Sequence, residues 1–303
     1  MRKLNAPNIR DLTHLCKLLH CRRTLLSVLC AHPERYYVRF PLRVGDKMRP
    51  IKQPVGKLGH VLRGVKGLLD MIELPPYLHG GIKGHSPMTN AAPHVHETAV
   101  LNFDVEDFFP SVRPRQVYEM FYKACRFPAD VARVLTRLVT FEGQLPQGSP
   151  TSTVVANLVI LHLAYRLYKL SHKHGCDYSH FVDDGTLSGP GYIKRLRPLI
   201  DKIIEQAGFR ASPKPHKRTT TYQPYEQVVT GVRADKGLNV PLLKVYGIRK
   251  VLRQLDAKVT AGIRPSETEI ASIMGKIQYV ATLSIPKARR LRARLSRIIT
   301  RAS

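Results

Sequence analysis

Hydrophobic residues follow two different spacings along this chain. In some stretches they recur every three to four residues, as in an α-helix, and in others they form short contiguous or alternating runs, as in strands. The helical spacing predicts helices over residues 9–31, 61–72, 114–140, 153–170 and 192–207, and throughout the segment from residue 241. The strand pattern predicts strands over residues 36–42, 48–51, 98–105, 178–182, 186–188 and 227–233. This mixture of helices and hairpins, followed only by helix, predicts an α+β fold.

The charge of the chain is unusual for a globular protein. Lys and Arg total 49 against 22 Asp and Glu, so the formal net charge is +27. Self-repulsion of that size is tolerated when the partner is a polyanion, which favours nucleic acid first and an anionic membrane second. The longest uncharged window, residues 143–165, is too polar to span a bilayer, so we expect no membrane partner. Five cysteines do not describe a disulfide framework, and we expect a cytoplasmic protein.

The basic excess is strongest in the C-terminal helical segment. Residues 236–303 hold 15 Lys and Arg and three acids. Six arginines fall on the final helix: Arg289, Arg290, Arg292, Arg294, Arg297 and Arg301. Three- and four-residue spacing places Arg290, Arg294 and Arg297 on one helix face. That face is either a solvated surface or, as we expect in so basic a chain, a site of contact with RNA or DNA phosphates.

Clustered acids are the anomaly in this composition. Asp104 ends a predicted apolar strand, and Asp183 and Asp184 lie at the tip of a predicted hairpin later in the chain. If the two strands are neighbours in one sheet, the three carboxylates converge, and they repel one another unless cations lie between them. Carboxylate oxygens suit Mg²⁺, and two such ions about 4 Å apart hold the attacking and leaving oxygens of a phosphoryl transfer. The pattern therefore predicts a site for two Mg²⁺ ions.

A two-residue acidic turn is often only structural, so the order of the neighbouring motifs matters. Between the acidic strands lies a loop, Leu145-Pro-Gln147-Gly148-Ser-Pro150, and then a helix that contains Asn157. A glycine after the glutamine lets the backbone approach a flat base pair closely. In this order the three segments resemble motifs A, B and C of reverse transcriptases, and within that family the bacterial retron type.

Three further sequence elements carry the resemblance to retron enzymes. Lys47-Met-Arg49-Pro-Ile51 resembles the fingers motif that holds the incoming triphosphate. Asn90-Ala-Ala-Pro-His94 matches the retron Asn-Ala-x-x-His element, and Val229-Thr230-Gly231 matches the retron Val-Thr-Gly element. The resemblance covers residues 36–300, and as a set these motifs are highly specific.

The chain departs from the family pattern at three places. Phe181-Val182-Asp183-Asp184 replaces the usual Tyr-Ala-Asp-Asp, which keeps both carboxylates. Gly185 stands where an apolar residue is usual, and we expect a looser hairpin from it. Residues 208–217 lack the family's usual Asn and Lys-Thr pair, so either Lys214 or Lys217 is the candidate that protonates the pyrophosphate leaving group.

The resemblance assigns roles residue by residue. It implies that Asp104 and Asp183 hold the two Mg²⁺ ions and that Asp184 supports them. Phe109 would lie under the sugar of the incoming dNTP and exclude a 2′-hydroxyl, unless Phe108 and Phe109 are both core residues. The expected nucleotide-binding residues are Lys47, Arg49, Phe109, Gln147, Gly148 and Lys214. The expected RNA- or DNA-binding residues are Asn90, His94, Val229, Thr230, Gly231, Arg290, Arg294 and Arg297.

The resemblance also implies a domain organisation. It implies an α+β right-hand polymerase fold with fingers, a palm built on an antiparallel sheet, and a helical thumb. Fingers and palm would interleave over residues 1–235, with N-terminal helices over 1–35, a fingers hairpin over 36–55 and palm motifs over 98–235. Residues 236–303 would form the strongly basic thumb.

Retron enzymes reverse-transcribe a cognate structured noncoding RNA into branched RNA–DNA called msDNA. They typically prime from a guanosine 2′-hydroxyl and usually act in antiphage defence. The resemblance implies the same partners here: the noncoding RNA, the msDNA product, dNTP substrates and a separate effector protein. Residues 236–303 offer too few acids for an RNase H site, so we expect a host RNase H to trim the template.

Other interpretations stay open at this stage. The chain could be another small bacterial defence reverse transcriptase with a different DNA product, or a non-catalytic RNA-binding scaffold that keeps a polymerase fold. An RNA-dependent RNA polymerase is a third alternative, which the bulky Phe109 disfavours. The cysteines and histidines within residues 14–32 lack a Cys-x-x-Cys pair, so we do not expect a zinc site there.

Overall fold

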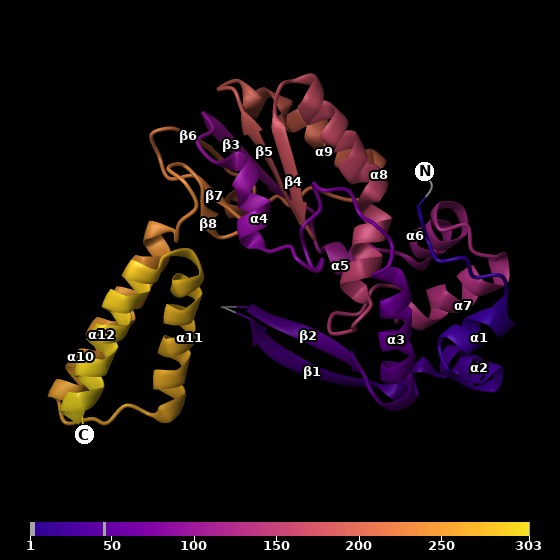
Figure 1. Ribbon diagram of the computed structural model, residues 1–303, viewed down its shortest axis with the longest axis horizontal. Coiled ribbons are helices and arrows are strands. Elements are labelled where there is room, and N and C mark those ends of the chain that lie inside the picture. Colours follow the sequence, from indigo (N-terminus) through magenta and orange to yellow (C-terminus); the bar gives the residue numbers. More distant parts are fainter. Residues whose placement is uncertain (1–3, 45–46, 303) are drawn as a thin grey trace.

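The computed structural model describes residues 4–44 and 47–302, without the side chains of Val44 and Lys47. Figure 1 shows three parts: a long β-hairpin flanked by helices, a sheet covered by helices, and a bundle of helices at one end of the molecule. The C-terminus lies at the end of this bundle, and the N-terminus lies on the opposite side of the molecule.

The first part is the hairpin with helices at its base. α1 (Leu12–Leu18) and α2 (Arg23–Ala31) precede β1 (Tyr37–Val44), which pairs antiparallel with β2 (Lys47–Pro54). α3 (Gly56–Leu69) follows and turns an apolar face into the main core, as its helical spacing requires.

The second part is a four-stranded antiparallel sheet in the order β4-β5-β3-β6. Its strands are β3 (Ala99–Asp104), β4 (Asp177–Phe181), β5 (Asp184–Gly189) and β6 (Thr220–Tyr222). β3 is central, with β5 on one side and β6 on the other. The strand of the first acidic motif therefore lies directly beside the hairpin of the second.

The main core covers one face of this sheet. Leu101 and Phe103 of β3 belong to it, and side chains of α8 (Ser152–Lys173) and α9 (Arg197–Gln206) complete it. α8 is apolar over most of its first four turns because it is buried against the sheet. The carboxylate at the end of β3 is thus anchored by the largest hydrophobic cluster in the protein.

A smaller core covers the opposite face. Val100 points away from Leu101, since successive strand side chains alternate, and it packs in a cluster with Ala91 and Val229. Ala91 ends α4 (Pro87–Ala91). Val229 belongs to a short hairpin of β7 (Val228–Val229) and β8 (Val232–Arg233).

Shorter elements connect these parts. The helical ones are α5 (Phe108–Ser111), α6 (Pro114–Glu119), the π-helical turn η3 (Met120–Ala124) and α7 (Ala129–Val139). The 3₁₀ turns are η1 (Pro33–Tyr36), η2 (Ala92–His94), η4 (Ile193–Leu196) and η5 (Pro215–Lys217).

The third part is the bundle of α10 (Leu242–Thr260), α11 (Glu267–Leu283) and α12 (Ile285–Ala302). These helices have a hydrophobic core of their own, separate from the main core. The Tyr279 hydroxyl donates a hydrogen bond to the Gly231 carbonyl, 3.0 Å away, which joins the bundle to the β7–β8 hairpin. Across residues 4–44 and 47–302, no helix is both long and apolar enough to cross a membrane.

The sequence-based elements are confirmed at most positions and wrong at two. Residues 227–233 form two strands rather than one, because Thr230 and Gly231 turn the chain with φ of 47° and 75°. Residues 114–140 are not continuous helix, since the chain breaks between η3 and α7 just before Ala129. The pattern also missed β6, whose three residues are too few to show a period.

Candidate active site

Three carboxylates meet at one end of the sheet. Asp104 is the last residue of β3 and pairs in register with Asp184, the first residue of β5. Asp183 lies in the β4–β5 turn, and its carbonyl accepts a hydrogen bond from the Val105 amide at 3.0 Å. One oxygen from each of the three carboxylates lies within 4.8 Å of the other two. The convergence expected from the sequence is therefore present.

Lys217 closes this cluster. Its Nζ donates to Oδ1 of Asp104 at 2.8 Å and to Oδ1 of Asp184 at 2.9 Å. Lys217 ends η5, just before β6 leads the chain back beside β3. Lys214, the other candidate, is exposed and makes no contact with the carboxylates among the described residues. Of the two lysines that the sequence left open, Lys217 is the one at the site.

The electrostatics fit a cation. Burial and the neighbouring Asp183 charge raise the pKa of Asp184 to about 7. Burial and the Asp104 charge likewise raise the pKa of Asp183. Burial lowers the pKa of Lys217, but its bonds to Asp104 and Asp184 outweigh that and raise it overall. The site offers only oxygen ligands, and its carboxylates repel one another unless a cation lies between them. Both features match the preferences of Mg²⁺.

Gly185, where the sequence predicts a looser β4–β5 hairpin, is packed against the neighbouring strand. Gly185 lies opposite Phe103 in the β3–β5 register. A Cβ at this position would overlap the Phe103 ring, with Cε1 only 2.8 Å away. The Phe103 ring, 2% exposed, fills the space that an apolar side chain would otherwise take. The two residues together fill the core under the carboxylates.

The adjacent phenylalanines have different environments. Phe108 is buried and packs edge-on against Phe209, with ring centroids 5.5 Å apart. Phe109 is only partly buried, and its carbonyl accepts from the Leu145 amide at 3.3 Å, at the start of the Pro-Gln-Gly loop. Phe108 is thus the core residue, and Phe109 is the one that a nucleotide could contact.

The Pro-Gln-Gly loop packs on the β1–β2 hairpin. The Lys52 amide donates to the Gln147 carbonyl at 2.7 Å. Gly148 has φ of 109°, and a Cβ there would lie 2.7 Å from Cγ2 of Ile51. Gly148 is therefore required for the approach of β2, a role that the sequence did not indicate. Arg49 is exposed on the same strand, and the predicted Lys47 side chain lies outside the described residues.

The two retron elements form contacts inside the protein. Asn90 and His94 are both 0% exposed, as is Val229. Asn90 Nδ2 donates to Thr230 Oγ1 at 2.8 Å, and the His94 ring lies 2.7 Å from both Ser179 Oγ and Ser188 Oγ. Burial lowers the pKa of His94 to about 3, so the ring is neutral. These three side chains therefore face the interior, and any part that they take in holding RNA or DNA would act through the fold; that role stays a prediction.

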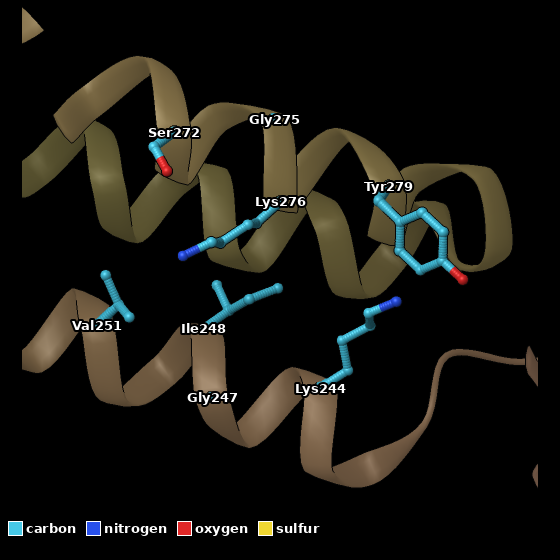
Figure 2. Close-up of a pocket in the computed structure, with 8 residues that line it drawn as sticks. All are labelled: Lys244, Gly247, Ile248, Val251, Ser272, Gly275, Lys276 and Tyr279. Atoms are coloured by element: carbon cyan, nitrogen blue, oxygen red, sulfur yellow. The ribbon is translucent and has the colours of Figure 1, made fainter. Parts of the chain in front are cut away.

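Two surfaces of the helical bundle are open to a ligand. Arg290, Arg294 and Arg297 line one groove of about 830 Å³, as their shared helix face predicts, and make no ion pair within the described residues. The α10–α11 groove, of about 670 Å³, is lined by Lys244, Gly247, Ile248, Val251, Ser272, Gly275, Lys276 and Tyr279. Figure 2 shows Lys276 reaching from α11 across this groove and Lys244 extending toward the Tyr279 ring. The Lys244 Nζ lies 3.6 Å from that ring's centroid.

The cysteines and histidines within residues 14–32, all of them described in the structure, do not bring three ligand atoms together. Among the described residues, the only group of three or more potential ligands within reach of one ion is Asp104, Asp183 and Asp184. Cys16, Cys21 and Cys30 are free thiols.

Sequence reasoning missed several residues that shape the site. Tyr279 and Lys244 belong to no sequence motif. They lie near Gly231 only because the helical bundle packs against the β7–β8 hairpin. His180 lies within the predicted strand of residues 178–182 and no motif marked it, although it is fully buried beside the carboxylate turn. The available signal was a histidine two residues before the turn that carries Asp183.

Comparison with known proteins finds relatives along most of the chain. The retron Ec86 reverse transcriptase of Escherichia coli is 28% identical over 307 residues, covering 98% of this chain and 92% of that protein. The retron Se72 enzyme of Salmonella heidelberg (strain 579083-10) is 31% identical over 61% of this chain and 50% of its own length. The retron Mx65 enzyme of Myxococcus xanthus is 30% identical over 86% of this chain and 64% of its own length.

No family model matches the chain. Among solved structures, a telomerase from Candida albicans in complex with a fragment of telomeric RNA has a TM-score of 0.47 at 11% identity, covering 88% of this chain and 60% of that one.

Proposed function

Because the chain is a reverse transcriptase of the retron type, we propose that it copies a cognate structured noncoding RNA into DNA at the Asp104–Asp183–Asp184 site. The mixed fold, with an antiparallel sheet followed by a helical bundle, supports a right-hand polymerase in which these parts would be fingers, palm and thumb. The observation that carries the proposal is the meeting of three carboxylates where β3 pairs with β5. Residues 1–235 would form fingers and palm, and residues 236–303 the thumb.

The carboxylates would hold the metal ions of the reaction. Asp104 and Asp183 would bind two Mg²⁺ ions, and Asp184 would support them. Bound there, the ions would supply Lewis-acid activation of the attacking hydroxyl and neutralise charge on the leaving pyrophosphate. Lys217 keeps a proton on Nζ beside the carboxylates, and we assign to it, rather than to Lys214, the protonation of pyrophosphate.

The remaining nucleotide contacts come from the hairpin, α5 and the Pro-Gln-Gly loop. Arg49 would bind triphosphate oxygens as a planar fork, with Lys47 beside it in β2. Phe109, the less buried of the two phenylalanines, would lie under the dNTP sugar and exclude a 2′-hydroxyl. Gln147 and Gly148 would support the template–nucleotide pair from the loop that rests on β2.

The carboxylate assignment is tested with Asp183→Asn. The amide keeps the shape but loses the charge, so dNTP incorporation on a primed RNA template should fall below detection while RNA affinity stays near that of wild type. Asp177→Asn is the matched control, since Asp177 is an exposed acid at the far end of β4. Appreciable polymerisation by Asp183→Asn would remove the catalytic assignment.

The proposal extends to the product and the partners. Priming from a guanosine 2′-hydroxyl of the noncoding RNA would give branched msDNA, a host RNase H would trim the template, and a separate effector would act with the complex in antiphage defence. The family of the chain supports these steps. Sequencing of the nucleic acid that copurifies with the protein tests them: one branched RNA–DNA species is expected, and unbranched DNA would contradict the priming step.

The thumb would hold nucleic acid through its cations. Arg290, Arg294 and Arg297 are available on α12, and Lys244 and Lys276 flank a groove without an acidic side chain. Each lost phosphate contact reduces the salt slope of log K by about 0.9 on a B-form duplex, and we expect a reduction of similar order here. Replacing the three arginines by Gln should therefore lower the slope for cognate and unrelated RNA alike, and an unchanged slope would identify a solvated face.

A further inference from the structure

The turn that presents Asp183 has an unfavourable backbone. Val182 has φ of 61°, in the left-handed region that β-branched residues avoid. A residue held there stores backbone strain, and it persists only where its surroundings impose it. Asp183 is the next residue, so the conformation of Val182 sets the direction of the carboxylate.

His180 holds this turn from inside the sheet. The side chain is 0% exposed, and its Nε2 lies 3.1 Å from the Val182 carbonyl oxygen. Its Nδ1 lies 2.9 Å from the Tyr178 hydroxyl. Because a carbonyl only accepts, Nε2 carries the proton, and in the neutral ring Nδ1 must then accept from Tyr178. Tyr178 thereby selects the tautomer that can donate to Val182.

The opposite side of the turn is closed by Gly80. A Cβ on Gly80 would overlap Cγ2 of Val182 and lie 2.6 Å from its nitrogen. The Gly80 carbonyl accepts from Asn157 Nδ2 at 2.7 Å, and Asn157 is buried on α8 just after the Pro-Gln-Gly loop. Val182 is thus held between a hydrogen-bond donor on one side and a fixed backbone on the other.

We propose that His180 is a positioning residue of the polymerase site, which through its bond to the Val182 carbonyl holds the strained turn that aims Asp183 at the metal ions. This inference rests on the proposed function of Asp183. Neither His180 nor Tyr178 touches substrate; both act through the turn. Loss of the bond lets Val182 relax toward a common backbone conformation, which rotates the Asp183 carboxylate away from the cluster.

The test compares His180→Leu with His180→Gln. Leucine cannot donate, whereas the glutamine amide can donate to the Val182 carbonyl. His180→Leu should lower kcat for dNTP addition about 10- to 100-fold, since small misplacements of catalytic groups have effects of that size. It should also raise the Mg²⁺ concentration for half-maximal activity and weaken Mn²⁺ binding measured by electron paramagnetic resonance. KM for dNTP should stay within about twofold, and His180→Gln should recover most of kcat.

His94→Leu is the matched control. His94 is also a fully buried, neutral histidine that contacts the same sheet, but it lies in η2 and bonds Ser179 and Ser188 and not the turn. The His94→Leu variant should be less stable than wild type, but the Mg²⁺ concentration for half-maximal activity should not change. If His180→Leu does not fold, Tyr178→Phe tests the proposal instead. This variant keeps the imidazole but removes the hydroxyl that selects its tautomer. It should also raise the Mg²⁺ concentration needed for half-maximal activity.

The outcomes separate the two proposals. The positioning role is overturned if His180→Leu needs the same Mg²⁺ concentration and binds Mn²⁺ as tightly as wild type. The same result in Tyr178→Phe overturns it where His180→Leu does not fold. Equal behaviour of His180→Leu and His94→Leu overturns it as well. Activity of Asp183→Asn in the same assay would instead defeat the proposed function itself.

Discussion

Asn90 and Thr230 are 140 residues apart in the chain and joined by a hydrogen bond of 2.8 Å from Asn90 Nδ2 to Thr230 Oγ1. Each belongs to one of the two retron sequence elements, so these elements are two halves of one contact. Through Gly231, the turn that contains Thr230 also receives the Tyr279 hydroxyl of the helical bundle. The pair therefore links α4, which lies on one face of the sheet, to the helical bundle of α10, α11 and α12.

Breaking this contact should destabilise the fold. Asn90→Ala should lower the free energy of unfolding by about 1–3 kcal/mol, because it removes a buried hydrogen bond and side chain. A double-mutant cycle with Thr230→Val in urea unfolding should give a coupling energy of about 1 kcal/mol. A cycle of Asn90→Ala with Thr136→Val, whose hydroxyl bonds its own helix, should be additive. Additivity for Asn90 and Thr230 would contradict the link.

Substitutions of Gly185 and Phe103 should partly compensate for each other in the free energy of unfolding. Gly185→Ala places a Cβ against the Phe103 ring and should lower the free energy of unfolding by about 1–3 kcal/mol through overpacking. Phe103→Leu removes the ring atoms that the Cβ meets, so the double variant should be more stable than the sum of the two changes predicts. Urea unfolding measures all three variants, and strict additivity would show that the ring does not fill the glycine's space.

Substitution of Phe109 should change nucleotide specificity, whereas substitution of Phe108 should change stability. Phe109→Ala should raise incorporation of rNTPs relative to dNTPs at least tenfold, a change of about 1.4 kcal/mol, because the ring beneath the sugar is gone. Phe108→Ala should leave that ratio unchanged and lower the free energy of unfolding by about 3–5 kcal/mol, since Phe108 is buried against Phe209. Single-nucleotide incorporation and urea unfolding check both. An unchanged ratio in Phe109→Ala would exclude it as the sugar gate.

Lys217 should act as the counter-charge of the cluster when no metal is bound. Lys217→Met leaves Asp104 and Asp184 without their bridging cation, so the melting temperature in EDTA should fall. Addition of Mg²⁺ should then raise the melting temperature more in this variant than in wild type, because bound ions relieve a larger repulsion. Lys214→Met removes the same charge from an exposed position and should behave like wild type. Equal Mg²⁺ responses in all three proteins would contradict this role.

The sequence alone determined the local features of this protein. The helices of residues 12–31 and 242–302 and the hairpin around Asp183 follow from the spacing of apolar residues, which depends on neighbours a few positions away. The placement of Asp104 and Asp184 at strand ends is equally local. That information was enough to expect a carboxylate cluster and, with the order of motifs, its family.

Only the tertiary structure decided which residues face the ligand and which support it. Lys217 rather than Lys214 reaches the carboxylates because β6 returns beside β3, a pairing between distant segments. Asn90 and His94 carry polar groups typical of a binding surface, yet the fold buries them because their partners come from segments more than 80 residues away. Burial is a property of the packed chain, and no pattern of neighbouring residues records it.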